Sequence, residues 1–249
     1  MATLLEVQNL YKAFGGVKAV RKLSFKLAEG QLLAMIGPNG AGKSTCFNLI
    51  NGQLRPDRGH IIIMGKKISG SKPRDVWQLG VGRTFQITAT FPSMTVLENV
   101  QMSILSHYRQ TKSLRRKVRH LYVDEAMALI NLVGIADQAD RPCGVLAYGD
   151  LKRVELAVAL GNQPKLLLMD EPTAGMGPAE RQALMKLTET IVRTRKIGVL
   201  FTEHDMQVVF DYADRIIVLN RGQMIAEGPP NEIQTNSEVK KIYLGSASP

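Results

Sequence analysis

The sequence predicts an α/β protein with a mostly parallel core sheet, an N-terminal antiparallel β layer and an inserted helical subdomain. Three observations support this. Apolar runs alternate with helical segments over residues 165–219, which is typical of a parallel sheet covered on both faces. Segments 4–10 and 22–27 alternate apolar and polar residues, as strands with one wet face do. Between residues 88 and 147, apolar residues recur at helical spacing.

The first two predicted strands are joined across Gly15 and Gly16, so they should pair antiparallel. Phe14 lies just before these glycines. An exposed ring at this turn would be placed to stack on a purine base, whereas a ring in the core would be structural. The residues alone leave both interpretations open.

A phosphate-binding loop follows the next predicted strand, residues 31–36. It fits the pattern Gly-x-x-x-x-Gly-Lys-Ser/Thr between a buried strand and a helix, which predicts a nucleotide site. Its glycines let successive backbone N–H groups converge on phosphates at a helix N-terminus. Lys43 should reach the β and γ phosphates, and Ser44 offers a hydroxyl to Mg²⁺. The loop consists of Gly37, Pro38, Asn39, Gly40, Ala41, Gly42, Lys43, Ser44 and Thr45.

After the loop, the chain continues the β layer and then enters the insert. Residues 55–59 indicate a turn and 60–64 a strand. Gln86 follows a strand-like segment at 80–82, and an amide there would contact Mg²⁺ or the attacking water. The predicted insert helices cover 96–105 and 123–133. A third amphipathic helix covers 150–160, and Asp150 near its start suits the helix dipole.

Two acids close the apolar run 166–169. At the carboxyl end of a buried strand, Asp170 is placed to hold Mg²⁺ and Glu171 to polarise the attacking water. The structural alternative is a pair that caps the helix after Pro172. His204 ends the next predicted strand at the same sheet edge and is placed to contact the γ phosphate and to orient Glu171. A surface histidine is the alternative for that residue.

Composition narrows the class of protein. The 249 residues are 45% hydrophobic, enough for a substantial core, and no run approaches the roughly 18 apolar residues of a membrane span. We expect a chain that is neither exported nor membrane-spanning. The only cysteines are Cys46 and Cys143. Because a bridge at Cys46 would distort the predicted loop helix, a reducing cytosol is the simpler inference, and no zinc pattern exists.

The formal net charge of +10 indicates a polyanionic neighbour: nucleic acid, an anionic membrane or an acidic partner. Part of this charge lies in one basic block within 109–119, which we interpret as a solvated helix face, a connector or a membrane-facing surface. The block contains Arg109, Lys112, Arg115, Arg116, Lys117 and Arg119.

The order of these motifs resembles that of an ABC-type ATPase, the nucleotide-binding subunit of ATP-binding cassette transporters. The resemblance rests on residues 37–45, Gln86, the segment Leu-Ala-Tyr-Gly-Asp at 146–150, residues 166–171 and His204, and it covers about residues 4–245. It implies a P-loop NTPase with a RecA-like core sheet that binds ATP and Mg²⁺. It also implies one domain, 1–249. Residues 1–86 and 162–249 would form the nucleotide-binding core with the β layer, and residues 87–161 the helical subdomain.

The resemblance further implies a homodimer or heterodimer with two ATP molecules at its interface. Each ATP would lie between the phosphate-binding loop of one subunit and the signature of the other, here Ala147, Tyr148, Gly149 and Asp150. Phe14 would stack on adenine. The chain departs from the family pattern at Ala147, where Ser is usual, at Tyr148, where Gly is usual, and at Gly177, where Asp is usual. Because Glu171 and His204 are both present, we predict an active ATPase.

Several segments resemble the branched-chain (hydrophobic) amino-acid uptake subfamily, namely 82–86, 146–150, 174–178 and 239–245. This implies an importer ATPase at the cytoplasmic face of the inner membrane, peripheral to permease subunits and fed by a periplasmic solute-binding protein. Relatives with similar motifs serve other small solutes. A lipopolysaccharide-export ATPase is one alternative, although such proteins lack so long and basic an insert. A soluble ABC ATPase acting on nucleic acid is another, but the chain has no room for two cassettes, and we expect no nucleic-acid partner.

Overall fold

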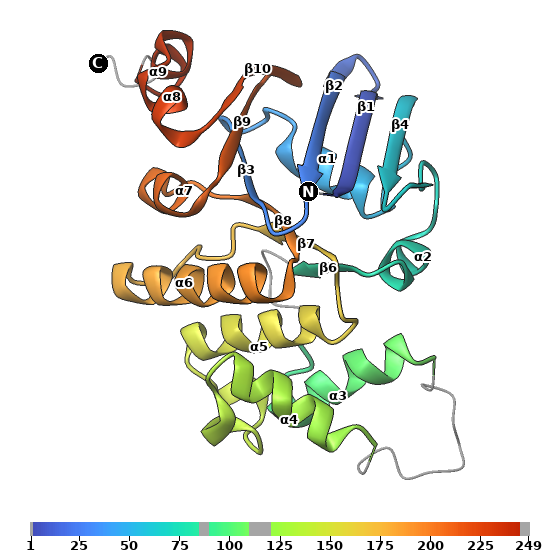
Figure 1. Cartoon of the computed structure of the whole chain (residues 1–249), viewed down its shortest axis with the longest axis vertical. Coiled ribbons are helices and arrows are strands. Elements are labelled where there is room, and N and C mark those ends of the chain that lie inside the picture. The colour runs from blue at the N-terminus through green and yellow to red at the C-terminus, as the bar shows by residue number, and fades with distance from the viewer. Residues whose placement is uncertain (1, 85–89, 110–120, 245–249) are drawn as a thin grey trace.

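Two β-sheets and a layer of helices build the computed structural model, which describes residues 2–84, 90–109 and 121–244 (Figure 1). The antiparallel sheet has the order β2-β1-β4-β5. Its strands are β1 (Thr3–Phe14), β2 (Val17–Ala28), β4 (Arg58–Ile63) and β5 (Lys66–Lys67). The larger sheet has the order β10-β9-β3-β8-β7-β6 and is parallel except between β9 and β10. Its strands are β3 (Leu32–Ile36), β6 (Val81–Thr84), β7 (Leu166–Asp170), β8 (Gly198–Thr202), β9 (Arg215–Asn220) and β10 (Gln223–Gly228).

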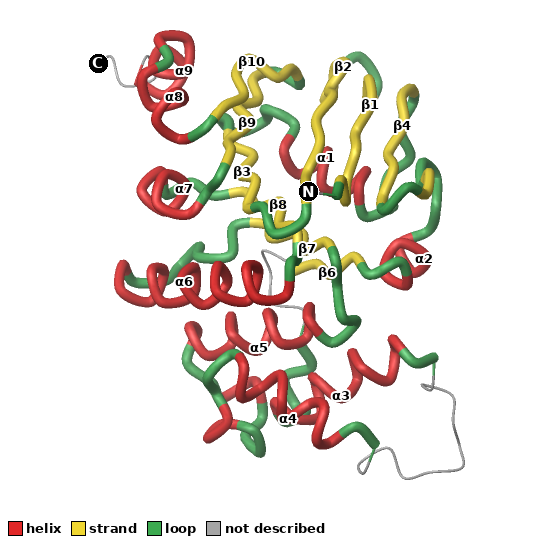
Figure 2. Tube along the Cα trace, in the orientation of Figure 1, coloured by secondary structure: helices red, strands yellow, loops and turns green. Residues whose placement is uncertain are grey.

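The helices lie mostly away from the antiparallel sheet (Figure 2). Three of them, α3 (Val96–His107), α4 (Val123–Leu132) and α5 (Tyr148–Leu160), pack together below α6 (Pro178–Arg195). The others are α1 (Lys43–Ile50), α2 (Pro73–Gln78), α7 (Met206–Tyr212), α8 (Pro230–Thr235) and α9 (Ser237–Leu244), and short 3₁₀ segments occupy Ala136–Gln138 and Cys143–Val145. In the described ranges, no helix combines the length and apolar character that a membrane crossing requires.

The central strands bury both faces, as predicted for a parallel sheet. In β3, Leu32, Ala34 and Ile36 face one hydrophobic core, whereas Leu33 and Met35 face the other. The same two-residue alternation divides β7, β8 and β9 between the two cores. One core packs against the insert helices, α6 and α7. The other packs against α1 and the antiparallel sheet. The mostly parallel core, the antiparallel layer and the predicted α/β class are therefore confirmed.

The N-terminal strands are confirmed but are longer than predicted. β1 and β2 pair antiparallel and turn at Gly15 and Gly16. Register shifts occur at several points, and Asn9 and Lys22 have positive φ, at 46° and 52°. These bulges break the strict alternation beyond 4–10 and before 22, so the pattern reveals only the regular part of each strand. The turn predicted at 55–59 is shorter in the structure, because Arg58 and Gly59 already belong to β4.

Among the described elements, the two 3₁₀ segments were not predicted, nor were α2, β5, β10, α8 and α9. They are short and lie at the periphery, where few residues are buried. Cys46 and Cys143 are both buried and free, as the expectation of reduced cysteines requires.

Candidate functional site

Three strand ends meet at one edge of the parallel sheet. β3 ends at Ile36 before the phosphate-binding loop, β7 at Asp170 and β8 at Thr202. Asp170 pairs in register with Thr202, and Ala34 pairs with Phe201 on the other side of β8. Residues that follow these strands therefore gather at the carboxyl edge, where open α/β sheets bind ligands.

The loop conformation depends on its glycines. Gly37, Gly40 and Gly42 have φ of 153°, 77° and 104°. A Cβ on Gly37 would lie 2.2 Å from the carbonyl oxygen of Leu219, and one on Gly42 would lie 2.3 Å from that of Ala19. These are backbone contacts that cannot yield, so any larger residue would displace the loop. At Gly40 the space is open and only the φ is unfavourable.

Lys43 begins α1, and its ammonium group lies within the loop. Its Nζ donates to the carbonyl oxygens of Gly37 at 2.6 Å and Pro38 at 3.2 Å. The side chain is buried, and desolvation lowers the pKa of Lys43, while the carboxylates of Glu171 and Asp170 act in the opposite direction. The ammonium is thus poised between the loop and the two acids.

The loop opens onto a cleft of about 480 Å³. The cleft is lined by Val17, Lys18, Ala19, Asn39, Gly40, Ala41, Gly42, Lys43, Ser44, Thr45, Glu171, His204 and Arg221. Lys18 and Arg221 are cations that no sequence pattern singled out. Lys18 reaches the cleft from β2. Arg221 lies in the turn between β9 and β10. This turn is held against the phosphate-binding loop by a hydrogen bond of 3.0 Å from the N–H of Gly222 to the carbonyl oxygen of Ala41. Only tertiary packing brings them to the loop.

Glu171 and His204 form a pair inside this cleft. His204 Nε2 lies 2.9 Å from Glu171 Oε1. Glu171 has a φ of 49°, which is unusual for a residue with a side chain, and its N–H donates to the Thr202 carbonyl and hydroxyl at 3.2 and 3.1 Å. The surrounding structure therefore holds Glu171 in a strained conformation that aims it at His204.

Asp170 is buried next to this pair. Its Oδ1 accepts a hydrogen bond of 2.8 Å from the Thr202 hydroxyl, and its Oδ2 lies 3.5 Å from an Arg83 nitrogen. A carboxylate has more lone pairs than these contacts use. Asp170 and the exposed hydroxyl of Ser44 thus provide oxygen donors, which Mg²⁺ prefers. The residues present fit a magnesium ion.

The predicted signature lies elsewhere in the chain. Ala147 is the N-cap of α5, and no side chain caps this helix. Tyr148 is exposed, and its ring packs over Gly175, where a Cβ would lie 3.2 Å from a ring carbon. None of the residues from Ala147 to Asp150 lines the cleft of the same chain.

The remaining predicted residues are placed as follows. Phe14 is 46% exposed, with the Lys12 ammonium 5.5 Å from its ring centroid, so it is not a core residue. It is not among the residues that line the cleft, although Val17 across the turn is. Gln86 lies outside the described residues, as do the basic residues from Lys112 to Arg119.

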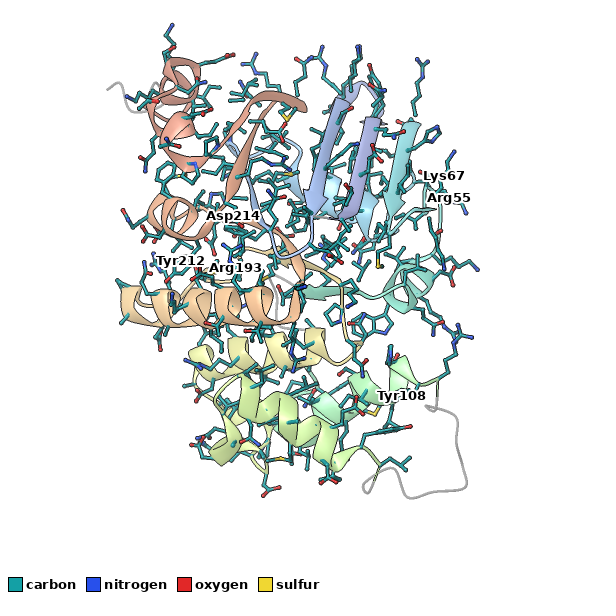
Figure 3. All side chains as sticks on the ribbon, viewed as in Figure 1. Arg55, Lys67, Tyr108, Arg193, Tyr212 and Asp214 are labelled. Carbon is teal, nitrogen blue, oxygen red and sulfur yellow. The ribbon has the colours of Figure 1, made fainter. Side chains whose placement is uncertain are left out.

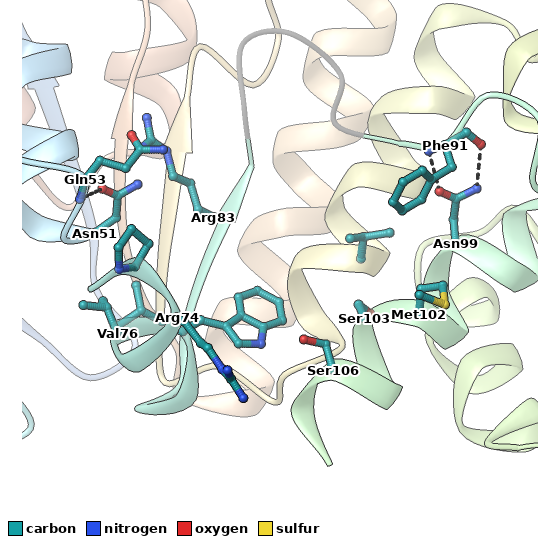
Figure 4. Close-up of a pocket in the computed structure, with 14 residues that line it drawn as sticks. Asn51, Gln53, Arg74, Val76, Arg83, Phe91, Asn99, Met102, Ser103 and Ser106 are labelled. Carbon is teal, nitrogen blue, oxygen red and sulfur yellow. Dashed lines mark hydrogen bonds between the residues drawn. The ribbon is translucent and has the colours of Figure 1, made fainter. Parts of the chain in front are cut away.

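A separate groove of about 520 Å³ lies between α2, α3 and α5 (Figure 4). Its lining includes Trp77, Arg83, Met102 and Phe91, and Phe91 is 56% exposed. Asn99 fixes the backbone of Phe91 in both directions: its Oδ1 accepts the Phe91 N–H at 2.8 Å and its Nδ2 donates to the Phe91 carbonyl at 3.2 Å. The groove is therefore bordered by the apolar ring of Phe91, and the buried amide of Asn99 holds the backbone of Phe91 in place.

Comparisons with known proteins agree with this geometry. A family model described as ABC transporter matches residues 20–174, and one described as branched-chain amino acid ATP-binding cassette transporter matches residues 223–248. The branched-chain amino acid transport ATP-binding protein LivG of Escherichia coli is 36% identical, with 98% of each chain covered. The lipopolysaccharide export ATP-binding protein LptB of Haemophilus influenzae is 34% identical, again over 98% of each chain.

Solved structures agree as well. The crystal structure of the ADP conformation of MJ1267, an ATP-binding cassette of an ABC transporter, matches with a TM-score of 0.88 and 31% identity, over 98% of this chain and 100% of that one. The dimeric structure of the bacterial ABC transporter cassette MJ0796 matches with a TM-score of 0.79 and 25% identity, over 91% and 99%. The chain therefore belongs to the ABC transporter family, as an ATP-binding cassette whose ATPase activity is coupled to transport.

Proposed function

We propose that this chain is the ATP-hydrolysing subunit of an importer for branched-chain amino acids or related small solutes. The observation that carries the proposal is the cleft that joins the phosphate-binding loop to Glu171 and His204. The relatives and the C-terminal family model support the solute class, because LivG is a branched-chain amino acid transport protein and the match at residues 223–248 is to that type of transporter.

ATP binds along the cleft through its phosphates. Backbone N–H groups of residues 37–45 and the Lys43 ammonium hold the β and γ phosphates. Phe14, exposed on the hairpin next to the cleft, stacks on adenine. Ser44, Asp170 and Gln86 hold Mg²⁺, which when bound neutralises the charge on the phosphates.

Glu171 accepts a proton from the attacking water, because its carboxylate faces the same cleft as Lys43. His204, at 2.9 Å, orients that carboxylate and hydrogen-bonds the γ phosphate. Gln86 contacts the same water or the ion.

A second ATPase subunit completes the site. The N-terminus of α5, with Ala147, Tyr148, Gly149 and Asp150, meets the γ phosphate held by the other subunit through its backbone N–H groups and helix dipole. The partner is a copy of this chain or a related cassette. The dimer of the similar cassette MJ0796 supports this assembly.

Permease subunits bind at the groove that is bordered by Phe91. The subunit therefore works as a peripheral protein at the cytoplasmic face of the inner membrane, fed indirectly by a periplasmic solute-binding protein.

Purification of the intact membrane complex tests this proposal. We expect the chain to co-purify with two permeases, and proteoliposomes to take up a branched-chain amino acid when ATP and the binding protein are supplied. The second candidate is lipopolysaccharide export, which the 34% identity to LptB favours. ATP-driven lipopolysaccharide extraction without amino-acid uptake would decide for it. Salt-sensitive DNA or RNA binding in place of permeases would contradict both.

A further inference from the structure

The carboxylate of Glu203 is buried between Thr173, in the segment after Glu171, and the backbone of His204, and 5% of the residue is exposed. Its Oε1 accepts hydrogen bonds from the Thr173 backbone N–H at 2.8 Å and from the Thr173 hydroxyl at 2.7 Å. Its Oε2 accepts the His204 backbone N–H at 3.2 Å. Among the described residues, no Lys or Arg forms an ion pair with Glu203. Because an isolated charge is costly to bury, these three donors are what keep this carboxylate in place.

A second set of contacts lies on the C-terminal side of His204. Arg181 donates from Nε to the Met176 carbonyl at 2.8 Å and forms an ion pair with Asp205. Asp205 also caps α7 through the N–H groups of Gln207 and Val208. His204 is therefore flanked by two acids, and each is connected to the segment 172–177, which follows Glu171.

These hydrogen bonds and this ion pair bear on the site because the backbone of Glu171 is strained. A residue at a φ of 49° keeps that conformation only where its surroundings fix it. Thr202 fixes the N–H of Glu171, and Glu203 fixes Thr173 two residues further on. The same Glu203 carboxylate fixes the backbone of His204. The buried carboxylate of Glu203 therefore holds both the segment that follows Glu171 and the backbone of His204. Glu171 and His204 form the pair in which His204 Nε2 lies 2.9 Å from Glu171 Oε1.

We propose that Glu203 is a positioning residue for ATP hydrolysis: it locks the segment after Glu171 to the segment that carries His204. Glu203 does not line the cleft, and its described hydrogen bonds go to Thr173 and His204. It therefore acts through the segment that follows Glu171 and through the backbone of His204. The inference rests on the roles proposed above for Glu171 and His204. It also assigns Thr173 as the group through which Glu203 acts.

The test uses Glu203→Gln in the full-length chain, with kcat and KM for Mg-ATP and the melting temperature measured. Glutamine keeps the volume, but its NH₂ must face either the Thr173 donors or the His204 N–H, so at least one hydrogen bond is lost. We expect kcat to fall roughly 10- to 100-fold, as for a lost hydrogen bond to a charged group, with KM within about twofold of wild type.

Asp214→Asn is the matched control. Asp214 also accepts a backbone N–H, from Leu32 at 2.8 Å, and it pairs with Arg193 (Figure 3). It lies at the opposite edge of the sheet, at the start of β3 and β9. We expect this variant to lose stability with no change in kcat. Equal losses of kcat in both variants at equal losses of melting temperature would reduce Glu203 to a structural role and overturn the inference.

A second pair of variants keeps the test decisive if Glu203→Gln fails to fold. Thr173→Val removes only the hydroxyl donor, and Thr173→Ser keeps it. We expect kcat to fall for Val, by roughly 3- to 10-fold, and to stay within about twofold for Ser. Wild-type kcat in Glu203→Gln or in Thr173→Val, with Glu171→Gln inactive, would overturn this inference alone. An active Glu171→Gln variant would instead overturn the proposed catalytic role.

Discussion

At the scale of single residues, the site depends on a few charged groups that a shared sheet edge brings together. Lys43 lies in the loop and is influenced by both Asp170 and Glu171, and Glu171 is paired with His204. Under the proposed function, ATP binding and ATP hydrolysis should be separable, because Lys43 is assigned to the phosphates and Glu171 to the attacking water.

Glu171→Gln should bind ATP as wild type does but turn over at least about 100 times more slowly, since general bases contribute roughly 10²- to 10⁴-fold. The neutral amide keeps the shape of the side chain and cannot accept the proton. Turnover assays with size-exclusion chromatography in Mg-ATP check this, and we expect stable dimers to accumulate. Near-normal turnover by such dimers would refute the role of Glu171.

Lys43→Ala should weaken nucleotide binding itself, by tenfold or more, because a charge-assisted hydrogen bond contributes about 1.5–3 kcal/mol. Titration with a fluorescent ATP analogue measures this. Lys66→Ala, a change of an exposed lysine in β5, is the control and should bind normally. Unchanged affinity in Lys43→Ala would mean that the phosphates lie elsewhere.

The affinity for ATP should also depend on pH. Burial holds the pKa of Lys43 below the ordinary lysine value of 10.5, so the ammonium loses its proton at a lower pH than an exposed lysine does. Affinity should start to fall on the alkaline side below pH 10.5, while the affinity of Lys43→Ala stays constant over that range. Parallel profiles for the two proteins would exclude Lys43 as the titrating group.

At the scale of elements, the phosphate-binding loop is shaped by two kinds of glycine. Gly40→Ala meets open space and should cost about 1 kcal/mol of stability for its positive φ alone. Gly42→Ala also puts a side chain at a positive φ and would place its Cβ 2.3 Å from the Ala19 carbonyl oxygen. This variant should therefore be clearly less stable than Gly40→Ala. Chemical denaturation of both variants measures the difference. Equal stabilities would contradict the described loop.

The start of α5 is another place where an element can be improved. Ala147 is an N-cap without a capping side chain. Ala147→Ser should stabilise the protein by about 0.5–2 kcal/mol, because its hydroxyl can accept an N–H of the first turn. It also restores the hydroxyl that is usual in the family signature, so we expect ATPase activity to rise. Thermal unfolding and turnover assays check both effects, and a less stable variant would argue against this N-cap assignment.

The elements also show what sequence patterns reveal. The strands β3, β7, β8 and β9 were predictable because both their faces are buried and they read as apolar runs. Elements such as α2 and β10 were not predicted, because a six-residue segment with few buried positions shows no clear hydrophobic period.

In the site, Lys43, Glu171 and His204 were predictable from motifs at strand ends. Thr202, Glu203 and Arg83 were not, because their roles arise from hydrogen bonds between segments distant in sequence. Lys18 and Arg221 belong to the same class, since only the fold brings them to the cleft.

At the scale of the whole molecule, the proposed function requires two separate surfaces of the chain to act together. The nucleotide cleft lies at the carboxyl edge of the sheet, and the N-terminus of α5 lies in the helical layer. Under the proposed function, one chain would contribute to two ATP sites only as part of a dimer. The groove beside α3 is the surface that we propose for a permease. Closure of two cassettes on ATP would move these grooves together.

The most direct test is a structure of the Glu171→Gln protein with Mg-ATP. We expect the γ phosphate beside Lys43, the ion held by Ser44 and Asp170, and residues 147–150 of a second subunit across the nucleotide. An ATP molecule bound away from the loop, or a γ phosphate distant from residues 170 and 171, would contradict it.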